Sequence, residues 1–156
     1  MKKLFVSIIT ISLLFSCRES TKATADENFD KKFDKYKDGF VTALWEIYPG
    51  WASGVGYHKL DSILVAPDGE EHKRQLDFAN AQLDSLKQYN LQSLSDNNKT
   101  DFHMIKNQME SILFYINELK SYEWNPSDYN VCGSFAEILN GKYDSPEVRL
   151  RAFNVK

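Results

Sequence analysis

Apolar residues recur every three or four positions between Ser95 and Tyr129, and this periodicity constrains the fold more than any other feature of the sequence. A helix with such a pattern has one apolar face, which it must bury against other elements. The apolar positions are Phe102, Ile105, Met109, Ile112, Leu113, Ile116 and Leu119. The spacing therefore predicts a long core-facing helix. Asn125-Pro126 is expected to end it, because proline lacks a backbone donor and disfavours helical angles in the residue before it.

Two earlier helices are predicted to pack on this one. The first begins near Asn28 and closes at Pro49-Gly50, and the second opens at Pro67-Asp68-Gly69 and ends near Tyr89-Asn90. The link of residues 91–95 is short, which favours an antiparallel pair, with Ser95 or Asp96 as the N-cap of the long helix. The inner faces hold Phe29, Phe33, Tyr36, Phe40, Leu44 and Ile47 in the first helix, and Leu76, Ala79, Leu83 and Leu86 in the second.

Two shorter helices are expected near the end of the sequence. Residues 133–139 can form one that stops at Asn140-Gly141, and Ser145-Pro146 is a strong start signal for the other. The last helix contains Val148, Leu150 and Phe153 but has little sequence to pack against. We therefore predict an all-α fold of antiparallel helices that is part of a larger helical domain; a complete domain with a frayed terminal helix is the alternative.

The connection of residues 48–67 is long and rich in glycine and aromatic residues. Such a connection in a small domain is more often functional than accidental. Gly54-Val55-Gly56 lacks the further glycine or the Lys-Ser/Thr of a phosphate-binding loop, so these glycines are interpreted as turn formers. His58 is expected to be a surface or hydrogen-bonded imidazole rather than a metal ligand.

The first residues have the pattern of an export signal. Lys2 and Lys3 precede an apolar run that ends at Phe15, about twelve residues against the ~20 that span a membrane. Ser16-Cys17 at the end of this run resembles the bacterial lipobox, in which the signal is removed and the cysteine is lipidated. The sequence thus predicts a signal peptide at 1–16, a flexible tether at 17–27 and a helical domain at 28–156, held at the cell envelope by lipid on Cys17 and facing the periplasm or the cell surface. The alternative is an ordinary cleaved signal with an incidental cysteine.

Charge and catalytic motifs exclude several functions. Without residues 1–16 the chain has 17 basic and 22 acidic residues, a net charge of −5, which is unfavourable for binding nucleic acid. His58, His72 and His103 are far apart in sequence and form no zinc-peptidase motif, and His72 and His103 are expected to be solvated or capping residues. Cys132 is expected to be a small buried residue rather than a nucleophile. No catalytic, metal or cofactor residue is therefore predicted in these 156 residues.

A resemblance to a known family rests on several short motifs. These are the lipoprotein-like start, Tyr48-Pro49, Gly54-Val55-Gly56-Tyr57-His58, Leu60-Asp61, and Glu123-Trp124-Asn125-Pro126 with Tyr129. Together they resemble the N-terminal part of the bacterial family called domain of unknown function 885. The resemblance implies a long, helical, exported protein similar to zinc metallopeptidases of the gluzincin kind. It also implies that the His-Glu-x-x-His zinc motif lies in the C-terminal half of the full-length protein, beyond the region matched here, and that the full-length protein takes a peptide substrate.

The aromatic corner admits two interpretations. Trp124, Asn125 and Tyr129 can pack a helix end, or they can form one wall of a substrate cleft that other sequence completes. At the level of the whole chain, the first hypothesis is the N-terminal helical portion of a metallopeptidase-like lipoprotein. The second is a self-contained helical lipoprotein that binds a partner or small ligand through the 48–67 connection.

Overall fold

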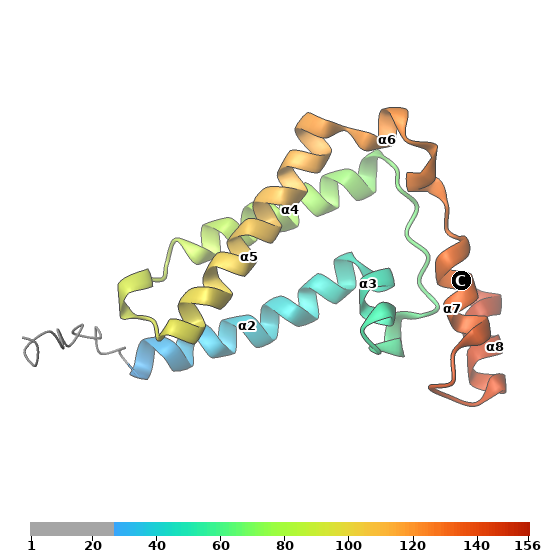
Figure 1. Ribbon diagram of the computed structural model, residues 1–156, viewed down its shortest axis with the longest axis horizontal. Coiled ribbons are helices and arrows are strands. Elements are labelled where there is room, and N and C mark those ends of the chain that lie inside the picture. The colour runs from blue at the N-terminus through green and yellow to red at the C-terminus, as the bar shows by residue number, and fades with distance from the viewer. Residues whose placement is uncertain (1–26) are drawn as a thin grey trace, which may run out of the picture.

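Residues 27–156 are the part of the chain that the computed structural model describes, and within them the secondary structure is helical, with no strand (Figure 1). The all-α prediction is confirmed. The longer helices are α2 (Glu27–Ile47), α4 (Gly69–Leu86), α5 (Asp96–Phe114), α7 (Cys132–Asn140) and α8 (Pro146–Val155). The short elements are α3 (Pro49–Gly54), η1 (His58–Leu60), η2 (Leu91–Ser93), the π-helical turn η3 (Tyr115–Leu119), α6 (Ser121–Trp124) and η4 (Pro126–Tyr129).

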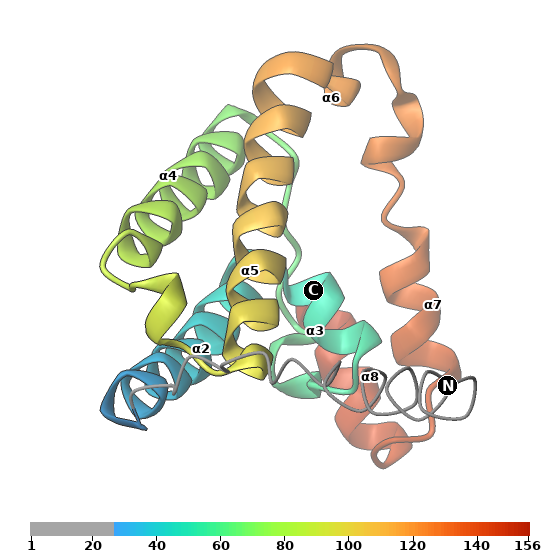
Figure 2. The same ribbon diagram turned by 60° about the vertical axis from the view of Figure 1, so that its left-hand side comes forward.

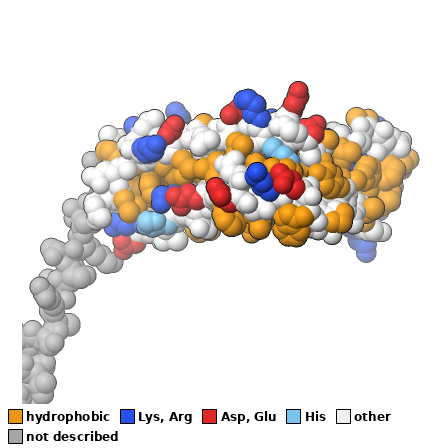
Figure 3. Space-filling model, turned by 90° about the horizontal axis from the view of Figure 1, so that it is seen from above, with side chains coloured by type: hydrophobic (Ala, Val, Ile, Leu, Met, Phe, Trp, Pro, Cys, Tyr) orange, Lys and Arg blue, Asp and Glu red, His pale blue; other side chains and the backbone are white. Residues whose placement is uncertain are grey.

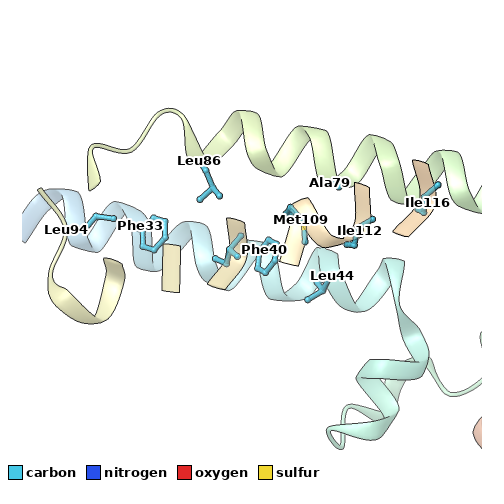
Figure 4. Close-up of a cluster of buried hydrophobic side chains, with 10 residues drawn as sticks. Phe33, Phe40, Leu44, Ala79, Leu86, Leu94, Met109, Ile112 and Ile116 are labelled. Carbon is cyan, nitrogen blue, oxygen red and sulfur yellow. The ribbon is translucent and has the colours of Figure 1, made fainter. Parts of the chain in front are cut away.

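The core lies where α2, α4 and α5 meet. Helices α4 and α5 run in opposite directions, as the short link between them predicts, and α2 packs against both (Figures 1 and 2). Figure 4 shows side chains from all three helices pointing into the same cluster. Phe33 and Met109 are fully buried, as is Leu94 in the link. The predicted inner faces of α2 and α4 are confirmed except at Phe29, which is only partly buried and lies outside this cluster; the other predicted positions are buried or packed against it.

Side-chain caps fix where three helices begin. The Asp68 carboxylate accepts from the backbone N–H of Glu71 over 2.9 Å at the start of α4. Ser95 caps α5, which decides between the two candidates, and Ser145 caps α8. Each cap satisfies a backbone donor that the first turn of a helix leaves without a partner.

The prediction that Asn125-Pro126 ends the long helix is wrong. The last turn of α5 widens into the π-helical η3, and the chain then leaves the helix at Lys120, whose φ of 48° is left-handed. The Lys120 N–H donates to the Tyr115 carbonyl over 2.9 Å, the five-residue step of a π-helix. Leu119 lies in this π-helical turn and is exposed, although the sequence predicts that it faces the core.

The 48–67 connection is more ordered than the sequence predicts. The predicted helix stop at Pro49 is instead the first residue of α3, a position where the missing N–H of proline costs nothing. Gly56 has a φ of 90° and makes the turn after α3, which confirms its interpretation as a turn former. A strap of irregular structure at 61–68 then leads to α4.

Helices α7 and α8 form a hairpin at one side of the molecule (Figure 1). The rings of Phe135 and Phe153 meet edge to face, with centroids 5.2 Å apart. Arg149 Nη1 donates to the carbonyls of Ile138 and Leu139 over 2.9 and 2.8 Å, which satisfies the end of α7. The hairpin contacts α3, so it lies beside the 48–67 connection, which ends 65 positions before α7 begins.

Candidate functional site

Asp61 is a buried carboxylate at the centre of the 48–67 connection, with 3% of its surface exposed. Ser53 in α3 donates to Oδ1, and Tyr143, 82 positions further along the chain, donates its hydroxyl hydrogen to Oδ2 over 2.5 Å. His58 Nδ1 lies 3.2 Å from the same Oδ2. Hydrogen bonds to Asp61 therefore join the 48–67 connection to the segment between α7 and α8.

Two further contacts strengthen this junction. The His58 ring lies flat on the ring of Tyr143, with centroids 3.3 Å apart and planes 5° from parallel. Lys156, next to the end of α8, donates to the main-chain oxygens of Asp61 and Ile63 over 3.0 and 3.2 Å. Three segments that are distant in sequence thus meet around one carboxylate.

The electrostatics of this junction favour a neutral tyrosine. Burial raises the pKa of the Tyr143 hydroxyl to about 12, and the hydrogen bond to Asp61 acts in the same direction. Loss of the tyrosine proton would place two negative charges side by side, which explains the second effect. Burial also lowers the pKa of the Lys156 amine below its usual value, against the attraction of Asp61. At neutral pH Tyr143 is therefore a constant donor to Asp61.

Ser53, His58 and Asp61 are the residue types of a serine hydrolase triad, but they are connected differently. In a triad the histidine takes the serine proton and the aspartate orients the histidine. Here the Ser53 hydroxyl donates directly to the aspartate, and His58 bonds the other oxygen of the same carboxylate. Ser53 is also buried, with 5% of its surface exposed. The hydrogen bonds of the cluster thus fix the shape of the connection, and His58 bonds the aspartate rather than the serine.

Sequence reasoning found one member of this cluster. His58 was expected to be a surface or hydrogen-bonded imidazole, and its contact with Asp61 confirms this. The spacing His58-x-x-Asp61 could have indicated the pair, because residues three apart meet on one helical turn. Tyr143 could not have been found in this way, because only the fold brings it to the carboxylate.

The aromatic corner satisfies its own polar groups. Trp124 Nε1 donates to the Leu119 carbonyl over 3.0 Å, and the Tyr129 hydroxyl donates to the Tyr122 carbonyl over 2.9 Å. Asn125 caps η4 through its side-chain oxygen. Trp124 and Tyr129 are nevertheless 64% and 51% exposed, so their rings offer apolar surface to a neighbour.

Two hollows border this corner. A hollow of about 260 Å³ is lined by Trp124, Asn125 and Tyr129, so the structure brings the three predicted cleft-wall residues together. Tyr129 also lines a second hollow of about 640 Å³, together with His72 and other residues of α4 and η3. The role of these three residues as a substrate wall stays a prediction.

His72, His103 and Cys132 lie in different surroundings outside the Asp61 cluster. His72 is half-buried against the ring of Tyr122, with centroids 4.2 Å apart, so the expectation of a solvated or capping residue is wrong. His103 is exposed, as expected. Cys132 was expected to be buried but is exposed, because it is the first residue of α7 and lies off the face that buries Ile138.

A further pair of hollows lies on the open side between α3, α5 and the strap. They measure about 470 and 520 Å³ and share Tyr48, Trp51, Gln75 and Asp128. The rings of Tyr48 and Trp51 are stacked, with centroids 4.2 Å apart and planes 12° from parallel. We call these two hollows together the Trp51 groove. Its walls are residues 47–51, 63–65, 75, 108, 112, 115, 116, 121, 128, 130, 131, 134, 137 and 156.

Tyr48 lies in the wall of this groove beside a polar network around the buried Glu71. Burial, and then the nearby Glu71 carboxylate, raise the pKa of its hydroxyl well above the usual value. Glu71 is itself buried and is held by Arg74 Nε and Gln75 Nε2 over 2.8 and 2.9 Å. Arg74 also reaches the Ile47 carbonyl at the end of α2 over 3.5 Å. This network fixes the corner between α2 and α3 from which Trp51 projects.

Residues 27–156 contain neither a grouped metal-ligand set nor a helix that could span a membrane. No three His, Cys, Asp or Glu side chains in this range are grouped to hold a metal ion. No helix in the same range is both long enough and apolar enough to cross a bilayer. Cys17, the predicted signal peptide and the predicted tether up to residue 26 lie outside the described residues, whereas Glu27 is the first residue of α2.

The chain matches no protein-family model and no curated protein. It is similar to a solved structure, that of a proposed lipoprotein of unknown function from Shewanella oneidensis. The sequences are 38% identical and the TM-score is 0.75 over 77% of this chain. The match covers 22% of the Shewanella protein, so this chain spans about a fifth of its length. Over the matched part the two proteins share one helical fold.

Proposed function

We propose that this chain is the helical N-terminal portion of a bacterial envelope lipoprotein, anchored to a membrane by lipid on Cys17. The similarity to the Shewanella lipoprotein is the observation that carries the proposal, because 38% identity with a TM-score of 0.75 is far above chance resemblance of folds. The Ser16-Cys17 motif after an apolar run supports the same location. One acyl chain binds membranes only marginally, whereas several acyl chains give a stable anchor.

Labelling with a radioactive fatty acid tests the anchor. The wild-type chain expressed in a bacterial host should incorporate label and sediment with membranes. Cys17→Ala should do neither, whereas Cys132→Ala should behave as wild type and so controls for loss of a thiol. Equal labelling of wild type and Cys17→Ala would contradict the proposal.

The finer proposal is that the complete protein resembles gluzincin zinc metallopeptidases, as the motifs shared with domain of unknown function 885 suggest. In that case this portion shapes or covers a cleft, and the zinc ligands come from other sequence. Coding sequence after Lys156 that specifies His-Glu-x-x-His would support it. Stoichiometric tight binding of zinc by purified residues 17–156 would count against it, because these residues would then supply the ligands themselves.

The second candidate is a self-contained helical lipoprotein that binds a partner or small ligand through the 48–67 connection. The Trp51 groove favours this candidate, since the connection supplies one of its walls. Hollows of about 470 and 520 Å³ are within the size range of small-molecule sites. A stop codon directly after Lys156 in the gene would favour this candidate over the first.

A further inference from the structure

Large apolar side chains stand half-exposed around the Trp51 groove. Trp51 and Tyr115 are 46% and 55% exposed, and Ile63 and Leu64 are 43% and 42% exposed. Soluble monomers rarely leave several large apolar side chains together at one hollow unless another molecule or segment covers them. The groove therefore has the character of an interface.

The groove is made by segments that the fold holds in place. Trp51 projects from α3, Tyr115 begins η3, and Ile63 and Leu64 belong to the strap. The strap is fixed at its start, because Lys156, which also lines the groove, bonds the carbonyls of Asp61 and Ile63. A surface held in this way can receive a partner without first being ordered, which lowers the entropic cost of contact.

Polar groups lie among the apolar ones. Gln75 and Asp128 line both hollows, Gln108 and Ser121 line one, and Asn130, Ser134, Glu137 and Lys156 line the other. Protein interfaces combine apolar side chains with hydrogen-bonding groups in this way. Figure 3 shows that hydrophobic side chains also gather on the upper face, toward the end of the molecule that α6, α7 and α8 occupy in Figure 1.

We propose that the Trp51 groove receives a polypeptide segment from the remaining part of a longer protein of the Shewanella type. This inference rests on the proposed function, in which the chain is one portion of such a protein. The matched region is 22% of the Shewanella chain, so most of that protein lies outside it and is available to pack against this portion. Apolar side chains of that segment occupy both hollows, next to the stacked rings of Tyr48 and Trp51.

A polypeptide segment fits the groove better than a small ligand does. Ile63 and Leu64 line one hollow and Tyr115 lines the other, and the two hollows meet at Trp51. A ligand that fills one hollow leaves the apolar side chains of the other exposed. A segment of several residues can cover all four side chains together.

A chimera tests the proposal. Residues 28–156 replace the matched segment in the Shewanella protein, and hydroxyl-radical labelling with mass spectrometry measures the reactivity of Trp51 and Tyr115. Both side chains should be strongly protected in the folded chimera relative to the isolated chain. Tyr115→Gln should lower the melting temperature of the chimera and leave that of the isolated chain unchanged. Val41→Gln, at an exposed α2 position outside the groove, should change neither.

Three outcomes would overturn the proposal. A folded chimera in which Trp51 and Tyr115 react as in the isolated chain would refute the groove assignment and leave the lipoprotein proposal intact. Dimerisation of the isolated chain that Tyr115→Gln abolishes would make a second copy the occupant. A chimera that does not fold would count against both the groove assignment and the equivalence of this chain to a portion of the Shewanella protein. Fatty-acid labelling of Cys17 is independent of all three results.

Discussion

Tyr143 donates a hydrogen bond of 2.5 Å to the buried carboxylate of Asp61, and this contact joins positions 82 residues apart. The same carboxylate is bonded by Ser53 and His58. The α7–α8 hairpin is thereby attached to the connection that forms one wall of the Trp51 groove. The position of that wall thus depends on one polar cluster.

Replacement of Asp61 should destabilise the fold. Asp61→Ala leaves the buried Ser53 hydroxyl and the Tyr143 hydroxyl without their acceptor, and each loss costs about 1–3 kcal/mol. Urea unfolding followed by circular dichroism should therefore show a lower midpoint. Asp84→Ala, at an exposed carboxylate of α4, is the control and should change stability by less than about 0.5 kcal/mol. Similar stabilities of the two variants would show that the Asp61 cluster contributes nothing.

The free energy of unfolding should fall at alkaline pH because of Tyr143. The pKa of its hydroxyl is raised from the usual 10 to about 12 in the folded state, so the unfolded state loses the proton first. The contribution of Tyr143 to stability is complete below pH 10 and is lost as the pH rises from about 10 to about 12. In Tyr143→Phe this part of the pH dependence should be absent. Tyr36, whose pKa burial also raises to about 12, should remain as a second source of alkaline sensitivity.

Acid stability should depend on Asp30. The backbone N–H of Ser95 donates to its Oδ1 over 2.8 Å and is the main reason that the pKa of Asp30 is lowered from its usual 3.8. The folded state therefore binds this proton less readily than the unfolded state does. The stabilisation is present above pH 3.8 and is lost as the pH falls through the lower folded-state pKa. Asp30→Asn should reduce stability at pH 6 and flatten its decline below pH 4, measured by thermal unfolding across that range. If the stability of Asp30→Asn declined below pH 4 as steeply as that of the wild type, the result would contradict this prediction.

Alanine substitutions of two methionines on α5 should differ sharply in their effect on the free energy of unfolding. Met109 is fully buried in the core between α2, α4 and α5, whereas Met104 is 66% exposed. Met109→Ala should cost about 2–5 kcal/mol, since it removes buried surface and leaves a cavity. Met104→Ala should change the free energy of unfolding by less than about 0.5 kcal/mol. Equal effects in denaturant titrations would contradict the packing of α5.

Glycine at position 120 should stabilise the protein. Lys120 adopts a left-handed conformation, which costs a non-glycine residue about 1 kcal/mol. Its ion pair with Glu123 is long, at 3.9 Å, and exposed, so little is lost with the side chain. Lys120→Gly should raise the melting temperature by a few degrees despite the greater flexibility of the unfolded chain. Lys120→Ala keeps the strain and should not.

Most helices could be predicted because their signals are local. The inner faces of α2 and α4 follow from the spacing of apolar residues. The starts of α4, α5 and α8 follow from N-cap residues, each of which accepts from a backbone N–H three positions later. The end of α5 could not be predicted, because no sequence signal marks a π-helical turn before Lys120. The exposure of Cys132 was missed for a related reason: residue type favours burial, but position at the first turn of α7 decides the outcome.

The features of the candidate site also divide into those that local sequence determines and those that only tertiary packing decides. The sequence by itself determined the longer helices, the acidic charge and the motif around Cys17, since each depends on residues within a few positions or on composition. Only the tertiary structure decided that Asp61 is buried and meets Tyr143 and the end of α8, and that Trp51 and Tyr115 stand at one groove. Those contacts join residues separated by 64 to 95 positions, and chain-wide packing rather than local preference sets them.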